Sequence, residues 1–282
     1  LSHYGTRPWA ELLQPAIQVA EEGTPVSPNL VRCIRSRQRT LALYREAARL
    51  FLGADGRGLQ PGQTWRFPDL AATLRRLARD GPREFYEGET ARRLDAEIKR
   101  GRGPLSRSDL ARYRPVWREP LRGSYRGHQV YTVPPPSGGG LQILQMLALL
   151  EPFEFLPENA GSAATYHLQA EAMRISFAER ATCLADPDFH DVPVADLLAP
   201  ERIETCRRGL YPDRAAGLDV LPAVQPLRVP PQSTASYVVA DPQGGWVAAT
   251  ESVNQWFGSL VVPQGTGILL NDVMDDFSRV PG

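Results

Sequence analysis

The sequence predicts a mixed α/β or α+β protein in which helices come first and a dense β region follows. Two observations support this. Helical periodicity recurs through most of the first 210 residues, and strand-like runs begin abruptly at residue 234. The chain has 282 residues and 42% hydrophobic content, which is enough for one sizeable core or two smaller ones.

The composition argues against several classes of partner. Lysine plus arginine and aspartate plus glutamate balance at 32 each, so no net field attracts nucleic acid or an anionic membrane. No run approaches the ~18 apolar residues of a membrane span, and no signal peptide opens the sequence. Four scattered histidines and three cysteines without a CxxC pair give no metal spacing. We therefore expect no nucleic acid partner, no membrane span, no metal and no cofactor.

Two helical blocks are predicted near the start. Residues 9–22 form an amphipathic helix that ends at Gly23, with Leu12, Leu13, Ile17 and Ala20 at helical spacing. Residues 30–52 form a second helical block that carries Arg32, Arg35, Arg39 and Arg45 among Leu41, Leu43 and Leu50. The arginines are compatible with a basic binding face, but a solvated helix face is the ordinary interpretation and the one we adopt.

The next segments combine helices with a short strand pair. Two helical stretches are predicted in residues 67–100 on either side of Gly81-Pro82, with Asp69 as an N-cap and Gly88 as an interruption. Residues 121–133 alternate like two strands that turn at Arg126-Gly127.

The run PPPSGGG, residues 134–140, precedes a segment that is apolar almost all round and therefore predicts a buried helix. Glycines at a helix start suit an anion, but the lysine and the Ser/Thr of a phosphate loop are missing after Gly140. We interpret the run as a tight strand-to-helix turn that brings backbone near an active site.

A long helix is predicted over residues 166–184, with one apolar face formed by Leu168, Ala172, Ile175 and Ala178. His167 lies within it and is interpreted as structural. Residues 211–232 contain five prolines and little periodicity, which is typical of an irregular connection.

The β region begins with two predicted strands, residues 234–241 and 245–254, separated by a turn at residues 242–244. Two more β segments are predicted within residues 258–271, around Gly265-Thr266-Gly267.

Polar residues gather in and after these strands, and no GxSxG, HExxH or EF-hand motif occurs elsewhere. The residues are Thr250, Ser252, Asn254, Asn271, Asp272, Asp275 and Asp276. Alternation places the first three on one face of a strand. Spacing alone favours a solvent-facing strand edge over a pocket lining.

Thr234 stands where the proline-rich stretch meets the first strand. A threonine hydroxyl is a poor nucleophile without a base, and the α-amine of an N-terminal threonine can be that base, with a pKa of ~7.7. Such an N-terminus requires a cut between Ser233 and Thr234. The same hydroxyl can make that cut by an N-to-O acyl shift, provided that the loop-to-strand junction holds the peptide under strain.

Several long motifs, in order, resemble the γ-glutamyltranspeptidase family of N-terminal-nucleophile hydrolases. They are PAIQVAEEGTPVS (15–27), FYEGETA (85–91), PPPSGGGLQILQML (134–147), EAMRISFAER with LADPDF (171–189) and FGSLVVPQGTGILLNDVMDDFS (257–278). The resemblance implies a four-layer αββα fold and autocleavage of one precursor into a large and a small subunit. It also implies a γ-glutamyl acyl-enzyme that is resolved by water or by an amino acid or peptide amine, with export from the cytoplasm common. On this pattern residues 1–233 form an N-terminally incomplete large-subunit region, and residues 234–282 begin a C-terminally incomplete small subunit.

The family pattern assigns roles to particular residues. Thr234 stands at the nucleophile, and Ser252 stands where a threonine usually hydrogen-bonds it. Asn254 and Asp276 stand where the α-amino and α-carboxylate end of a γ-glutamyl substrate, such as glutathione, is bound. Asp276 is the expected partner of the substrate ammonium.

The chain also departs from the family pattern. It has Thr234-Ala235-Ser236 where Thr-Thr-His is usual, and Val273 where a polar Gln or Glu is common. It lacks the early segment with a carboxylate-binding arginine and stops before the residues of the oxyanion hole. Two alternatives therefore stay open: an acylase for glutaryl or other side-chain amides, and a catalytically inactive structural homologue.

Overall fold

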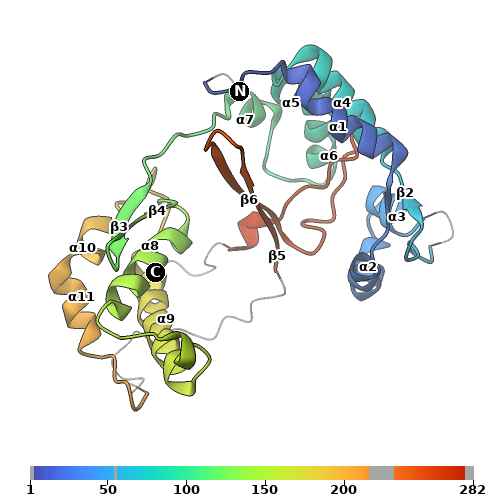
Figure 1. Ribbon diagram of the computed structural model, residues 1–282. Coiled ribbons are helices and arrows are strands. Elements are labelled where there is room, and N and C mark those ends of the chain that lie inside the picture. The colour runs from blue at the N-terminus through green and yellow to red at the C-terminus, as the bar shows by residue number, and fades with distance from the viewer. Residues whose placement is uncertain (1–2, 54–55, 216–231, 277–282) are drawn as a thin grey trace. The chain divides into compact units, whose positions relative to one another are not determined.

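The computed structural model describes residues 3–53, 56–215 and 232–276 (Figure 1). The chain divides into two compact units. Unit 1 joins Leu1–Arg114 to Val229–Pro281, and unit 2 contains Pro115–Arg228. Every predicted site residue falls in unit 1.

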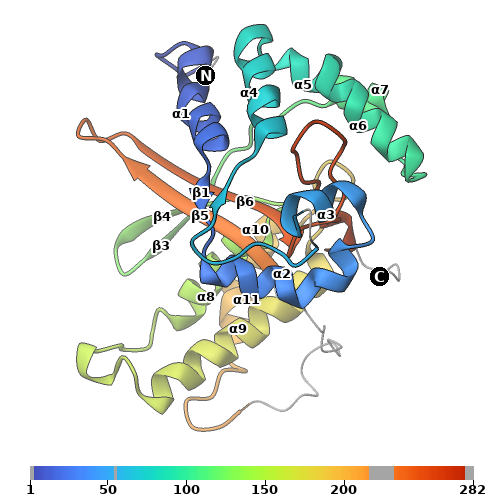
Figure 2. The same cartoon turned by 90° about the vertical axis from the view of Figure 1, so that its right-hand side faces the viewer.

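Unit 1 begins with helices that largely follow the predictions. They are α1 (Trp9–Glu22), α2 (Pro28–Leu41), α3 (Arg45–Phe51), α4 (Pro68–Asp80), α5 (Arg83–Glu87), α6 (Glu89–Arg100) and α7 (Arg107–Arg112). α1 packs along α4 (Figure 2) and ends at Gly23, as predicted. A Cβ at Gly23, whose φ is 85°, would lie 2.6 Å from the Trp65 carbonyl oxygen, so only glycine fits.

Two details of these helices differ from the predictions. The block at 30–52 is two helices, because the chain turns between them and the Tyr44 N–H bonds the Leu41 carbonyl at 3.1 Å. Asp69 is not the N-cap of α4. Phe67 occupies that position, and the Asp69 carboxylate pairs instead with Arg49. An ion pair with a neighbouring helix therefore replaces the expected cap.

The apolar core of unit 1 brings together residues distant in sequence. Phe51 of α3 meets Phe257 edge-on, with ring centroids 4.7 Å apart. Leu260 and Val262 are buried in the same cluster. Its remaining members are Val26, Val31, Cys33, Ile34, Leu41, Ala47, Leu52 and Leu59. The segment that follows the predicted strands is thus anchored in the core formed around α2 and α3.

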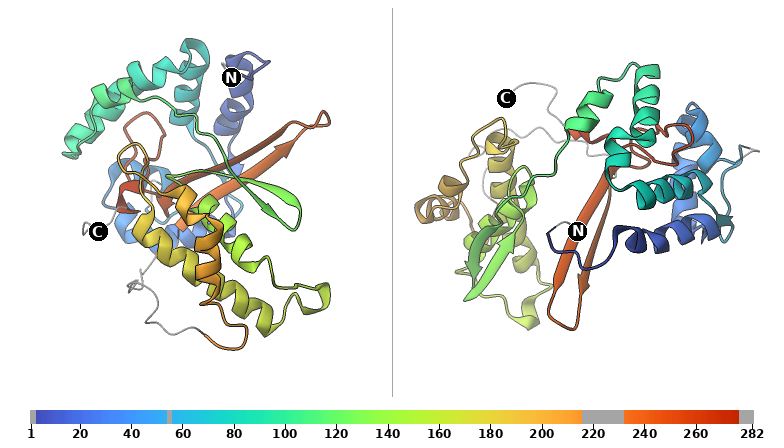
Figure 3. Two further views of the ribbon diagram at one scale, coloured as in Figure 1. Left: turned by 90° about the vertical axis from the view of Figure 1, so that its left-hand side faces the viewer. Right: turned by 90° about the horizontal axis from the view of Figure 1, so that it is seen from above.

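The predicted hairpin is confirmed as β5 (Gln232–Ala240) paired antiparallel with β6 (Trp246–Gln255), shown from two sides in Figure 3. A shorter pair joins β1 (Thr24–Pro25) to β2 (Thr64–Trp65). The two β segments predicted within 258–271 are wrong. Left-handed φ values at Phe257, Gly258 and Leu260 break the pleat there, and only isolated bonds remain, including Ser259 N–H to the Leu270 carbonyl at 3.0 Å. A short 3₁₀ helix, η3 (Val273–Asp276), follows.

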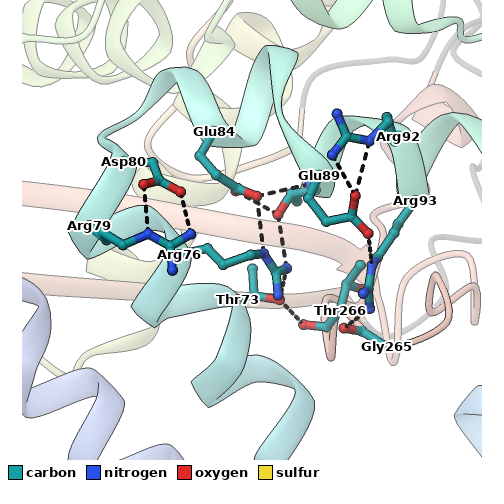
Figure 4. A network of polar contacts seen from close by, with 11 residues as sticks. Thr73, Arg76, Arg79, Asp80, Glu84, Glu89, Arg92, Arg93, Gly265 and Thr266 are labelled. Atoms are coloured by element: carbon teal, nitrogen blue, oxygen red, sulfur yellow. Dashed lines mark hydrogen bonds and ion pairs between the residues drawn. The ribbon is translucent and has the colours of Figure 1, made fainter.

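A polar network holds the turn at 263–267 against the helices (Figure 4). The Thr73 hydroxyl of α4 donates to the Thr266 carbonyl at 2.9 Å, and Arg93 of α6 donates to the Gly265 carbonyl at 2.8 Å. Gly267 approaches so closely that a Cβ there would lie 2.5 Å from the Leu70 nitrogen.

The centre of this network is the buried carboxylate of Glu84. It accepts bonds from Arg76 Nε at 3.1 Å and from Thr90 through its N–H at 3.0 Å and its hydroxyl at 2.7 Å. Arg76 also donates to the Thr73 hydroxyl at 2.9 Å, which links Glu84 to the turn. Because its oxygens are so well supplied with donors, this buried charge is stabilised.

Unit 2 contains the other predicted elements, which are β3 (Leu121–Tyr125), β4 (His128–Thr132), α8 (Gly138–Leu150) and α9 (Ala163–Cys183). It also contains three short elements that were not predicted: η1 (Pro157–Asn159), α10 (Val194–Leu197) and α11 (Pro200–Arg207). The strand pair turns at Arg126-Gly127, both with positive φ, as a tight hairpin requires. Gly140 lies in the first turn of α8, where a Cβ would stand 1.9 Å from the Val133 carbonyl oxygen.

The predicted apolar face of α9 is confirmed, because all four of its residues are buried. His167 Nε2 lies 2.7 Å from the Tyr211 carbonyl oxygen, in agreement with a structural role. Most of the predicted irregular connection, residues 216–231, lies outside the described residues. Within the described part of the chain, no helix combines the length and the apolarity that crossing a membrane requires.

Candidate functional site

Thr234 and Ser252 occupy directly opposed positions on β5 and β6. The Thr234 hydroxyl donates to Ser252 Oγ at 3.1 Å. Two residues further along, the Thr250 hydroxyl donates to Ser236 Oγ at 3.2 Å. A two-residue step returns to the same face of a strand, so these hydroxyls share one face of the hairpin.

A β-bulge interrupts the hairpin beside Thr234. Between the Thr234–Ser252 pair and the Gln232–Gln255 pair, β6 has two residues where β5 has only Ser233. Asn254 is one of the two and has a φ of 72°. Its side chain is buried, with 5% exposed. Simple alternation along β6 did not anticipate this bulge, although asparagine is among the residues enriched at positive φ.

Asn254 connects the hydroxyl pair to the acidic turn that follows. Its N–H donates to Ser252 Oγ at 2.9 Å. Its Nδ2 donates to the Asp272 carbonyl at 3.3 Å and to Asp276 Oδ1 at 3.2 Å. The structure therefore brings together the predicted residues Thr234, Ser252, Asn254 and Asp276 in one line of hydrogen bonds.

The turn at 271–276 is fastened to the end of β6 by the backbone and the side chain of Asp272. The Asp272 N–H bonds the Val253 carbonyl at 3.2 Å, and Asp272 Oδ1 accepts from the Gln255 N–H at 3.0 Å. Asp275 and Asp276 are exposed on this turn. The turn thus presents carboxylates to solvent beside the hydroxyl pair, which suits a cationic group on a substrate.

Gln255 contacts this turn and Arg37 contacts Gln255, and neither residue was predicted. Gln255 Nε2 donates to Asp275 Oδ2 at 2.6 Å, and Arg37 of α2 donates to Gln255 Oε1 at 3.2 Å. No local pattern could have found Arg37, because it precedes Gln255 by 218 positions. The Ser233 side chain, Phe277 and Ser278 lie outside the described part of the chain.

The geometry orients the Thr234 hydroxyl but does not activate it. Ser252 Oγ accepts hydrogen bonds from the Thr234 hydroxyl and from the Asn254 N–H, so its position is fixed from two sides. A serine hydroxyl is too weak a base to remove a proton from threonine at neutral pH. The base must come from elsewhere, and the arrangement itself supplies alignment. Among the described residues, no group of three histidine, cysteine or acidic side chains is arranged to hold a metal ion.

Sequence comparison relates the chain to two kinds of enzyme precursor. It is 39% identical to the Acylase ACY 1 proenzyme of Pseudomonas sp. strain SE83, over all of this chain and 50% of that protein. It is 38% identical to the glutathione hydrolase proenzyme of Pseudomonas aeruginosa, over 99% of this chain and 49% of that protein. The chain spans about half the length of the curated relatives it matches.

Solved structures agree with the predicted fold class. Helicobacter pylori γ-glutamyltranspeptidase is 31% identical, with a TM-score of 0.73 over 76% of this chain and 62% of that one. The cephalosporin acylase of Bacillus halodurans is 31% identical, with a TM-score of 0.81 over 98% of this chain and 50% of that one. The mixed helix-and-sheet fold of the N-terminal-nucleophile hydrolases is thereby confirmed. The family model described as Gamma-glutamyltranspeptidase matches residues 1–281, and the chain belongs to the γ-glutamyltranspeptidase family.

Proposed function

We propose that this protein is an autoprocessing γ-glutamyl hydrolase or transpeptidase that acts through an acyl-enzyme on Thr234. The observation that carries the proposal is the line of hydrogen bonds from Thr234 through Ser252 and Asn254 to Asp276. Unit 1 thereby joins three groups. They are the nucleophile Thr234, Ser252 to align it, and Asp276 to bind a substrate ammonium.

Maturation begins with the uncut chain. Thr234 Oγ attacks the carbonyl carbon of Ser233, the C–N bond breaks, and the hydroxyl proton passes to the departing amine. Water then hydrolyses the Ser233 ester and leaves a carboxylate on Ser233 and a free α-amine on Thr234. Residues 1–233 would belong to the large subunit and residues 234–282 to the small one. The proenzyme names of both curated relatives support a precursor that is processed into subunits.

Catalysis uses the amine that the cut creates. As Thr234 Oγ attacks the γ-carbonyl of a donor such as glutathione, its α-amine takes the hydroxyl proton and passes it to the leaving amine. Water, or the amine of an amino acid or peptide, then releases the γ-glutamyl group from the ester. Ser252 keeps the hydroxyl aligned. Asn254 and Asp276 hold the α-amino and α-carboxylate end, with Asp276 facing the ammonium.

A second candidate is an acylase for glutaryl or other side-chain amides, which lack the ammonium. Val273 favours it, because an apolar side chain 45% exposed stands on the acidic turn where a polar partner would be expected. Ala235 also offers no hydroxyl beside the nucleophile. The similarity to the Acylase ACY 1 proenzyme and to cephalosporin acylase supports this candidate as well.

One experiment tests both candidates. The full-length protein is analysed by intact mass and by N-terminal sequencing of any small fragment, and is then assayed with γ-glutamyl and glutaryl anilides. We expect a fragment that begins at Thr234 and faster turnover of the γ-glutamyl donor. The reverse substrate order would select the acylase. One uncut chain without activity toward either anilide would contradict both and identify an inactive homologue.

A further inference from the structure

The side chains of Asn254 and Gln255 both tie the acidic turn to β6, and Gln255 does so through its backbone as well. Gln255 Nε2 donates to Asp275 Oδ2 at 2.6 Å, while the Gln255 N–H donates to Asp272 Oδ1 at 3.0 Å. Asp275 directly precedes Asp276, and both lie in η3. The Asp276 carboxylate is therefore held directly by Asn254 and, through its neighbour Asp275, by Gln255.

The chemistry of its partners fixes the orientation of the Gln255 amide. Arg37 has only donors, so the atom that faces Arg37 Nη2 at 3.2 Å must be Oε1. The Asp275 carboxylate only accepts when ionised, so the atom that faces it must be Nε2. Glutamine is matched to both neighbours at once, whereas glutamate would set a second carboxylate against Asp275.

Arg37 belongs to a helix that is firmly held. α2 buries Val31, Ile34 and Leu41 in the core of unit 1, where Phe257 is also buried. Among the described residues Arg37 forms no ion pair, and its guanidinium donates a hydrogen bond to Gln255. Arg37 is therefore linked to the acidic turn by hydrogen bonds through the Gln255 amide.

We propose that Arg37 and Gln255 are positioning residues that set the preference of the site for donors carrying an α-ammonium. The inference rests on the proposed function, because it takes Asp276 as the partner of that ammonium. Held by Gln255, the turn keeps Asp276 at hydrogen-bonding distance from Asn254, 3.2 Å from its Nδ2. Without Gln255 or Arg37 the turn moves, and an ammonium loses its aligned partner. A glutaryl donor has no ammonium and is indifferent to the change.

The test compares Arg37→Ala, Gln255→Ala and Gln255→Glu in the full-length protein. Arg35→Ala is the matched control, because Arg35 is exposed on the same helix and makes no hydrogen bond or ion pair with a described residue. Extent of cleavage, kcat and KM are measured with γ-glutamyl and glutaryl anilides. Hydrogen exchange of residues 271–276 is measured in parallel and needs no activity.

We expect KM for the γ-glutamyl donor to rise about 10-fold in Arg37→Ala and Gln255→Ala, as for one lost hydrogen bond to a charged group. We expect at least the same rise in Gln255→Glu. Cleavage, kcat and the KM of the glutaryl donor should change by less than about 2-fold, as expected when only substrate binding is altered. The Arg35→Ala control should match the wild type.

Two results would overturn the positioning role while leaving the proposed function intact. One is an unchanged KM for the γ-glutamyl donor, and the other is an equal rise for both donors. A wild type that does not turn over γ-glutamyl donors would count against the proposed function instead. In that case exchange at 271–276 decides: faster exchange in Arg37→Ala and Gln255→Ala than in the control supports the positioning role, and equal exchange refutes it.

Discussion

Thr234 and Ser252 face each other across β5 and β6 with their side-chain oxygens 3.1 Å apart. The contact depends on strand register rather than on proximity in sequence, because 18 positions separate the two residues. The strongest prediction of the proposed mechanism therefore concerns this pair.

Ser252→Ala should slow both the cut after Ser233 and donor turnover about 10-fold, because the nucleophile loses one aligning hydrogen bond. Ser252→Thr keeps a hydroxyl and should retain most of both rates. Time-resolved intact mass and anilide hydrolysis measure the two steps. Thr250→Ala is the matched control, since it removes the neighbouring Thr250–Ser236 bond on the same face. Equal slowing in Thr250→Ala would assign the effect to the hairpin as a whole.

Asp276→Asn should raise KM for γ-glutamyl donors about 10- to 100-fold, because a charge-assisted bond to the substrate ammonium is lost. The amide can still contact Asn254, so the turn should remain in place. KM for a glutaryl donor should stay within about 2-fold of wild type. The KM values for the γ-glutamyl and the glutaryl donor are measured in the same variant. An equal rise in both would show that Asp276 does not bind the substrate ammonium.

Glu84→Gln should destabilise the protein by about 3 kcal/mol, because Arg76 and Thr90 lose a charged acceptor within a largely buried network. Urea unfolding monitored by circular dichroism measures the loss. Glu87→Gln breaks the exposed pair with Arg83 and should change stability by less than about 1 kcal/mol. Similar losses of unfolding free energy in the two variants would show that the Glu84 network stabilises the protein no more than an exposed ion pair does.

Gly140→Ala should impair folding, because its Cβ would stand 1.9 Å from the Val133 carbonyl oxygen, far inside van der Waals contact. Gly139→Ala places its Cβ in open space within the same helical turn and should be neutral or slightly stabilising. Soluble yield and thermal midpoint of both variants compare the two positions directly. Equal midpoints would mean that α8 can shift to accommodate the methyl group.

Asp109 gives a prediction about pH. The Ser106 hydroxyl and N–H, followed by Arg112, hold the pKa of this carboxyl at about 2, below its ordinary value of 3.8. A lowered pKa stabilises the folded state above pH 3.8, and this contribution is lost as the pH falls through about 2. Carboxyl chemical shifts across this range measure the midpoint. Ser106→Ala should move it back toward 3.8, and an unmoved midpoint would exclude the cap as the cause.

Local patterns predicted the helices and the main hairpin well, because periodicity, capping glycines and turn residues act over a few positions. The face of α9 and the end of α1 at Gly23 are examples. Asp69 was predicted wrongly because a distant Arg49 competes for its carboxylate. The β segments after residue 258 failed for a similar reason: burial of Phe257 and Leu260 overrides the extended preference of their neighbours.

For the candidate site, the family resemblance named Thr234, Ser252, Asn254 and Asp276, and the structure shows how they connect. The connection could not be predicted from spacing, because it requires the left-handed conformation at Asn254. Gln255 and Arg37 escaped notice because their role arises only when α2 packs beside the end of β6.

The bulge in β6 also determines which hydroxyl of β5 lies opposite Ser252, and so which one the proposed mechanism can use as its nucleophile. Ser233 and Thr234 are adjacent, and a slip of β5 by one residue would bring Ser233 to the register position opposite Ser252. The extra residue in β6 lies between the Gln232–Gln255 pair and the Thr234–Ser252 pair. A slip of β5 would therefore disturb the Gln232–Gln255 pair and also every pair from Thr234–Ser252 to the hairpin turn. If the chain is cut as proposed, we expect strand alignment, rather than a chemical preference for threonine over serine, to select the bond that is cut.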